Sequence, residues 1–144
     1  MGNQAVVVEL LGSNRDGEPR RFTIADAEIV KKGDLMVMTD PRTCTSAAAT
    51  SSMAISAAAG IAAEDKAGGE GIVSITLWTD GIFDLVCSGG IFIGESIGFM
   101  GGNVVGALFS PLSFASGAAV AGYTMESIAA TGGATETINV RLRL

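Results

Sequence analysis

The sequence predicts an all-β protein made of a single small domain in which the chain repeats itself once. Short segments rich in Val, Ile, Phe and Thr recur along the chain, separated by turn residues at intervals of about 8–12 residues. Two segments, FTIADAEIVKKGDL from Phe22 and FDLVCSGGIFIGES from Phe83, have equal length and begin 61 positions apart. A chain of 144 residues is long enough to bury a core as one domain.

The expected strands are short and end at recognisable turns. Asn14–Gly17 (NRDG) predicts a hairpin tip, because Asp-Gly supplies the positive φ that tight hairpins need. Pro41 ends the strand before it. The Ala-rich segment Thr45–Gly60 is the exception, and its composition suits either one or two helical turns or an extended loop. The remaining segments favour a sandwich or a barrel, and they read VVVEL, RFTI, LMVM, IVSITLW, GIFDLV, IFIG and TINVRL.

The repeat extends beyond the two opening segments. At the offset of 61, the Gly-acid pair at 33–34 aligns with the pair at 94–95. GIAAE at 60–64 aligns with GYTME at 122–126 at an offset of 62, and a Gly-Gly pair and an alternating strand follow each. The same order of motifs in both halves of the chain predicts a duplicated unit. The last strands align Val73, Ile75 and Leu77 with Ile138, Val140 and Leu142.

The predicted organisation is one domain covering residues 1–144. An N-terminal strand or arm occupies residues 1–12, and a C-terminal strand occupies residues 136–144. The first repeat covers about residues 20–66, and the second covers about residues 81–127.

Charge and composition argue against several classes of function. The net charge of −6 disfavours nucleic acid as a partner. The chain has no histidine, the commonest general base and metal ligand, so we expect no enzyme, no cofactor and no metal site. Asp34, Asp40 and Asp80 are interpreted as turn residues rather than calcium ligands. Cys44 and Cys87 are interpreted as two buried thiols, with one bridge as the alternative.

The segment Ser96–Met125 contains no charged residue, a length that would span a bilayer. Its many glycines and serines do not suit a spanning helix, so we expect no membrane partner. The segment instead predicts β-structure whose apolar surface is covered by neighbouring protein. We therefore predict a subunit interface that uses aromatic and sulfur side chains of this half, namely Phe92, Phe99, Met100, Phe109 and Phe114.

Trp78 is a further predicted partner-binding residue. The alternation of its strand directs Val73, Ile75 and Leu77 toward the core, which leaves Trp78 on the opposite face. The repeat has arginine on that face. An outward tryptophan requires a partner, which is either another subunit or its own loop.

The chain resembles the small capsid decoration proteins of tailed viruses. The resemblance lies in KKGDLMVMTDP, AAAGIAAEDKAGGEGIVSITLWTDGIFDL and GAAVAGYTMESIAATGGATETINVRLRL, and it covers most of the chain from Lys31 onward. It implies a β-barrel or β-tulip domain that forms a homotrimer on the outer capsid surface of the virion and clamps neighbouring major capsid subunits. In that family an N-terminal arm adds a strand to the capsid, which assigns Val6, Val7 and Val8 as partner-binding residues. The alternative is that VVVEL is the first strand of the barrel.

Two other classes of function are compatible with the composition. An extracellular filament or surface-layer subunit would also be rich in Gly, Ala and Ser, and would assemble through head-to-tail contacts. A small β enzyme or sugar-binding domain would need a cleft lined by aromatic and acidic residues, for which one Trp, one Tyr and six Phe provide little material.

Overall fold

The computed structural model describes residues 4–10, 19–48, 57–88, 93–94, 96–107, 122–126 and 135–144. Within these residues every regular element is a β-strand, which confirms the predicted all-β class. The predicted hairpin tip at 14–17 lies outside the described residues. So does most of the Ala-rich segment, in which Thr45–Ser46 and Ala58–Gly60 lie in strands and Ala47–Ala48 form a bend and a turn.

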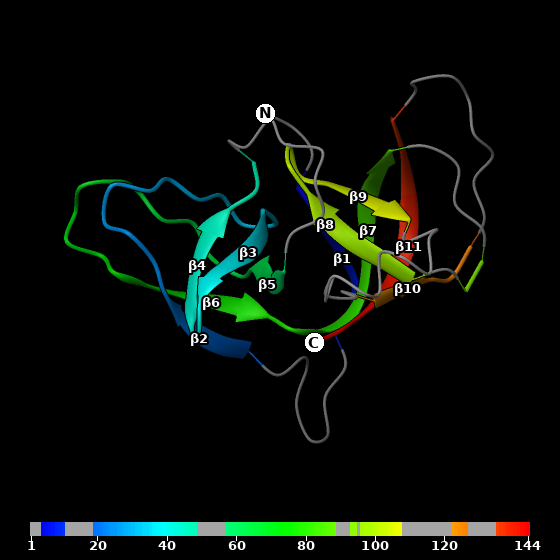
Figure 1. Cartoon of the computed structure of the whole chain (residues 1–144), viewed down its shortest axis with the longest axis horizontal. Helices are drawn as coiled ribbons and strands as arrows, with labels where there is room; N and C mark the ends of the chain where they lie inside the picture. The colour runs from blue at the N-terminus through cyan, green and yellow to red at the C-terminus, as the bar shows by residue number, and fades with distance from the viewer. Residues whose placement is uncertain are drawn as a thin grey trace.

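Five strands form a closed barrel, here called barrel 1, which occupies the left half of Figure 1. The ring order is β2-β4-β3-β5-β6. The β2–β4 pair is parallel, and the other four pairs are antiparallel. The strands are β2 (Pro19–Thr23), β3 (Leu35–Asp40), β4 (Thr43–Ser46), β5 (Ala58–Ala62) and β6 (Ser74–Trp78).

The other six strands form one sheet in the order β1-β7-β11-β10-β8-β9, on the right of Figure 1. Because β9 also pairs in parallel with β7, five of these strands close a second ring, here called barrel 2. β1 is added beside β7. The strands are β1 (Val6–Leu10), β7 (Asp80–Ser88), β8 (Ser96–Met100), β9 (Val104–Ala107), β10 (Gly122–Thr124) and β11 (Thr135–Arg143).

The two barrels have the same strand pairing. Strands β2 to β6 of barrel 1 correspond in order to β7 to β11 of barrel 2, including the single parallel pair in each. The register corresponds as well: Leu35 pairs with Ile61 in barrel 1, and Ser96 pairs with Tyr123 in barrel 2. The chain is therefore a tandem of two units with one topology.

Pairing also fixes which residues of the two units are equivalent. Thr23 pairs with Thr43, the first residue of β4, and Val86 pairs with Val104, the first residue of β9. This equivalence matches Phe22 with Leu85, two positions beyond the Phe83 of the sequence alignment. Because strand side chains alternate with period two, the displacement leaves the same face inward. By the same reasoning Trp78, opposite Ile61, matches Arg141, opposite Tyr123.

The repeated Gly-acid motif forms the same turn twice. Gly33 and Gly94 have φ values of 93° and 80°, a region in which glycine is strongly favoured. The Gly33 N–H donates to Ala62 O at 2.8 Å, and the Gly94 N–H donates to Thr124 O at 2.9 Å. Glu95 lies outside the described residues.

The repeated G-x-x-x-E motif attaches the following strand. The Glu64 carboxylate accepts a hydrogen bond from the Thr76 N–H at 2.8 Å, and the Glu126 carboxylate accepts one from the Asn139 N–H at 2.6 Å. Each acidic side chain therefore satisfies a backbone donor of β6 or β11.

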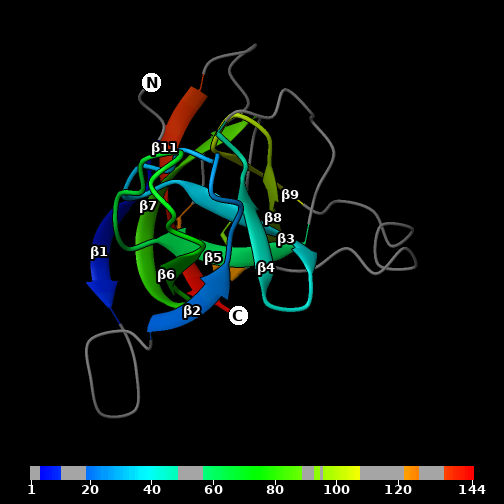
Figure 2. The ribbon, with the colours of Figure 1, turned by 90° about the vertical axis from the view of Figure 1, so that its left-hand side faces the viewer.

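Barrel 1 encloses its own hydrophobic core. The inward side chains come from all five strands and the adjoining loops, and they include Met36 of β3 and Ala59 and Ala62 of β5. Figure 2 looks onto barrel 1, with β7 and β11 of barrel 2 behind it. The remaining members of this core are Ile24, Val30, Cys44, Ile75 and Leu77, with Phe22 packed at its edge.

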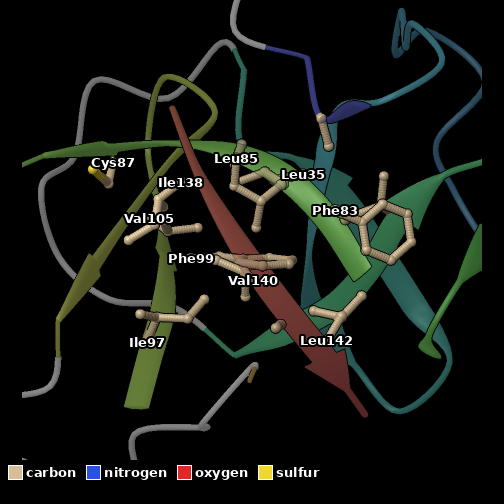
Figure 3. Packing of buried hydrophobic residues seen from close by; sticks show 14 of the residues in the cluster. Leu35, Phe83, Leu85, Cys87, Ile97, Phe99, Val105, Ile138, Val140 and Leu142 are labelled. Atoms are coloured by element: carbon tan, nitrogen blue, oxygen red, sulfur yellow. The ribbon is translucent and has the colours of Figure 1, made fainter. Parts of the chain in front are cut away.

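The core of barrel 2 continues onto the outer face of barrel 1. Leu35 and Ile61 point away from the barrel 1 core and are fully buried in the same cluster as Phe83 and Phe99 of barrel 2. Figure 3 shows Leu35 packed beside Leu85 and near Phe83. Strand β5 and the first three residues of β3 are thus buried on both faces, which explains the continuous apolar runs LMV and AAGIA in place of alternation.

A buried polar contact also joins the two barrels. The Asn103 side chain, in the β8–β9 turn, donates to Asp34 Oδ1 at 2.8 Å and accepts from the Leu35 N–H at 3.0 Å. Asp34 also accepts from Gln4 Nε2 at 2.9 Å and from the Lys31 N–H at 2.9 Å. Asp34 and Asn103 are 3% and 2% exposed. This Asp34–Asn103 bridge satisfies polar groups that would otherwise be buried without partners.

Candidate partner-binding surface

The predicted N-terminal partner-binding residues lie on β1, at the edge of the six-stranded sheet. Val6 and Val8 are 59% and 52% exposed, whereas Val7 packs against the core of barrel 2. Among the described strands, β1 pairs with β7 alone. Val6 and Val8 thus lie on an accessible edge strand, the arrangement that accepts an added strand from a partner.

Trp78 is used within the chain, at the contact between the barrels. It is half-buried and packs against the shared core. Its ring centroid lies 6.0 Å from that of Phe83, and Lys32 Nζ lies 5.5 Å from the ring centroid. The partner required by this outward tryptophan is therefore barrel 2 of the same chain together with a lysine of barrel 1.

We expect Trp78→Ala to lower the free energy of unfolding by about 2 kcal/mol, because it removes a half-buried aromatic side chain from the shared core. Urea unfolding followed by far-ultraviolet circular dichroism measures the change. Tyr123→Ala, the removal of an exposed aromatic residue, is the control and should change stability by less than about 0.5 kcal/mol. Equal stability of the Trp78 variant and the parent would contradict this placement.

The predicted aromatic interface of the second half is only partly described. Phe99 is fully buried inside barrel 2, so it is a core residue and not part of the chain's surface. Met100 is half-buried, and its sulfur covers Gly106, where a Cβ would lie 2.4 Å from Sδ. Phe92, Phe109 and Phe114 lie outside the described residues.

Several large apolar side chains that the sequence did not single out are exposed. One group lies on barrel 2, where Ile93, Tyr123 and Met125 are 67%, 45% and 44% exposed. The Gly94–Thr124 hydrogen bond holds their two segments together. The GYTME motif carried a signal, since its second residue is aromatic where the first copy has isoleucine. Elsewhere, barrel 1 exposes Met38 in β3 and Ile29 and Ile72 in its loops. The prediction that Val73 faces the core is wrong: it precedes β6 and is 56% exposed, and strand pairing makes Ile75 the equivalent of Ile138.

Several acidic side chains accept hydrogen bonds from backbone N–H groups and hydroxyl groups of the chain itself. Glu28 accepts from the Thr45 hydroxyl at 2.6 Å and from the Ser46 N–H, and Asp26 accepts from the Gly71 N–H at 2.7 Å. Within the described residues, no group of three or more Cys, Asp or Glu side chains is placed to hold a metal ion. The described part of the chain also contains no helix long and apolar enough to cross a bilayer.

Both cysteines are buried, free thiols, as the sequence suggested. Burial, and secondarily the charge of Glu28, raises the pKa of Cys44 from 9.0 to about 11. We therefore expect Cys44 to resist iodoacetamide at pH 8 in the folded protein, because the thiolate is the reactive form. Peptide mass spectrometry measures the modification, with urea-unfolded protein as the positive control. Rapid alkylation of the folded chain would contradict the assignment.

The same shift predicts a loss of stability in alkaline solution. The unfolded chain releases the Cys44 proton near pH 9.0 and the folded chain near pH 11. Between these values the unfolded state binds fewer protons, so the contribution of Cys44 to stability declines as the pH rises. Cys44→Ala should flatten this part of the pH dependence in urea titrations at pH 8 to 11, and an unchanged slope would contradict it.

The paired barrels provide a basis for comparison with known proteins. No family model matches the chain, and no curated protein matches it. The chain does match solved structures. The chain is similar in fold to the N base of head fiber gp8.5 in bacteriophage phi29. The superposition has a TM-score of 0.50 at 12% sequence identity, and it covers 87% of this chain and 94% of the phi29 N base. Both proteins are covered almost throughout, so the likeness concerns the whole architecture.

Proposed function

We propose that this chain is a non-enzymatic structural protein of a phage head, and more specifically a decoration protein that binds the outer capsid surface as a trimer. The observation that carries the proposal is the whole-chain likeness to the N base of a head fiber. The resemblance of the KGD and G-x-x-x-E segments to decoration proteins supports the same assignment from sequence.

The physical properties of the chain suit this role. Two barrels joined by a shared core and a buried polar bridge form a stiff body, as a clamp across capsid subunits requires. Binding at several points makes individually weak contacts strong in sum. The net charge of −6 repels DNA, which is useful on a surface exposed to released genomes.

The edge strand β1 is the proposed contact with the major capsid protein. Val6 and Val8 present apolar side chains beside a strand edge, which suits addition of a capsid strand. Lysine at an edge opposes such pairing. Val8→Lys should therefore weaken capsid binding while leaving the fold intact, and Ile72→Lys on barrel 1 is a matched exposed control.

The proposal is tested with shells assembled from the major capsid protein encoded in the same genome. Purified chain should co-sediment with the shells, and electron microscopy should show added density at regular positions on the outer surface. Shells carrying the chain should also withstand higher temperature before opening. Absence of binding, or a polydisperse ladder of polymers in sedimentation, would favour a filament or surface-layer subunit instead.

A further inference from the structure

The contact between the two barrels is made by one outer face of barrel 1, and the equivalent face of barrel 2 carries exposed apolar side chains. In barrel 1 this face centres on Leu35 and Ile61, which are both 0% exposed because barrel 2 covers them. Their equivalents in barrel 2 are Ser96 and Tyr123, which pair with each other as Leu35 pairs with Ile61. Tyr123 is 45% exposed.

The neighbouring positions extend the same comparison. Lys32 precedes the Gly33 turn, and its equivalent Ile93 precedes the Gly94 turn, where its side chain is 67% exposed. Ala63 and Met125 follow equivalent strands, and Met125 is 44% exposed. Barrel 2 is thus more apolar than barrel 1 at these two positions. At the third position, Tyr123 provides an aromatic side chain where barrel 1 has Ile61. Ile93, Tyr123 and Met125 are here called the Tyr123 face.

The opposite side of the contact also has an equivalent, and its side chains are exposed. Asn103 reaches barrel 1 from the β8–β9 turn with φ 58°, and its equivalent in the β3–β4 turn is Arg42 with φ 65°. These are the positive-φ non-glycine residues of the described chain. Phe99 of β8 is 0% exposed, whereas its equivalent Met38 of β3 is 40% exposed. Met38 and Arg42 are here called the β3–β4 corner.

We propose that the Tyr123 face of one copy binds the β3–β4 corner of a second copy, so that the contact between barrels within a chain is repeated between chains. We assign a second copy as the partner because, within one chain, the equivalent face of barrel 1 is covered by the other barrel. Both surfaces needed for the repeated contact carry exposed side chains: Ile93, Tyr123 and Met125 on the Tyr123 face, and Met38 and Arg42 at the β3–β4 corner. The contact joins different surfaces, so it is head-to-tail, and successive copies close into a ring or extend as a fibre.

The intermolecular contact is expected to be weaker than the intramolecular one. Ser96 replaces Leu35 on the face, and Arg20 stands where register places Phe83 on the opposing barrel. Less apolar area is therefore buried. The inference rests on the proposed function only in expecting that the ring closes as a trimer.

Complementary variants provide the sharpest test. Met38→Asp removes one side of the contact and Tyr123→Asp removes the other, so each variant alone should sediment as a monomer at concentrations where the parent associates. In an equimolar mixture one intact Met38 side meets one intact Tyr123 side, and we expect a heterodimer and nothing larger. Ile72→Asp, equally exposed on barrel 1, should associate like the parent. Each substitution should weaken association about tenfold or more.

Cross-linking tests the same contact without disruptive charges. Chains carrying Arg42→Cys, mixed with chains carrying Ile93→Cys, should form covalent dimers with a short bismaleimide. Ile72→Cys in place of Ile93→Cys should not, and the buried native cysteines provide a low background. Circular dichroism verifies that each variant is folded.

A mixture that stays monomeric, together with absence of the specific cross-link, would overturn the inference. So would association of both aspartate variants at the parent's affinity. Neither result depends on capsid binding, so failure of this contact and failure of the proposed function are distinguishable.

Discussion

Asn103→Gly is expected to lower the free energy of unfolding by about 3 kcal/mol. The substitution keeps a residue suited to φ 58° and removes the amide that bridges the barrels. The buried Leu35 N–H then has no acceptor, and the buried Asp34 carboxylate loses one of its donors. Water cannot readily replace these partners, because Asp34 is 3% exposed.

Arg42→Gly is the matched control for this variant. Arg42 occupies the equivalent turn position with φ 65°, but its side chain is exposed. We expect its unfolding free energy to lie within about 0.5 kcal/mol of the parent. Urea titrations followed by Trp78 fluorescence, at a protein concentration too low for association, compare the two. Equal effects of both substitutions would show that the bridge does not stabilise the barrel pair.

Gly122→Ala is expected to destabilise barrel 2 by about 3 kcal/mol or more. A Cβ at Gly122 would lie 2.1 Å from Arg141 O and 2.9 Å from Arg141 C. These are backbone atoms of β11, the paired strand, so no side-chain rotation relieves the clash and the β10–β11 pair must separate. The equivalent Gly60 is similarly close to Trp78 O, at 2.6 Å.

Gly102→Ala separates this steric effect from the conformational preference of glycine. A Cβ at Gly102 meets nothing within 4 Å, but φ is 73°, so the substitution should cost only about 1 kcal/mol. Denaturant unfolding of the two variants measures the difference. Hydrogen exchange should also show β10 and β11 opening more often in the Gly122 variant. Similar stabilities would mean that β10 shifts at little cost.

The sequence was sufficient for the fold class because strand propensity and turn residues act locally. Most of the predicted strand segments contain strands, and the two G-x-x-x-E motifs perform one structural task. The segment IFIG is an exception, because its described residues Ile93 and Gly94 form a turn. The exact register between the two copies was harder to predict from the sequence. Phe22 was aligned with Phe83, whereas pairing matches it with Leu85, because a displacement of two preserves the apolar alternation.

The candidate surface was harder to predict because apolar character does not reveal what covers a side chain. Phe99 and Tyr123 lie in the same uncharged segment, yet Phe99 is buried in barrel 2 and Tyr123 is exposed. Strand alternation predicts that Trp78 faces away from the core of its own strand and needs a partner, either another subunit or its own loop. That partner is barrel 2, which only the tertiary arrangement identifies. A pairwise comparison of the two copies would have marked Tyr123, since its equivalent is the aliphatic Ile61.

The shared core has a consequence for synthesis of the chain. Barrel 1 encloses a core of its own, whereas the interior of barrel 2 is completed by Leu35 and Ile61 on the outside of barrel 1. Barrel 2, whose core is completed by barrel 1, is therefore translated after barrel 1. We expect barrel 1 to close while the ribosome is still adding the second half, and to serve as the surface on which later strands assemble.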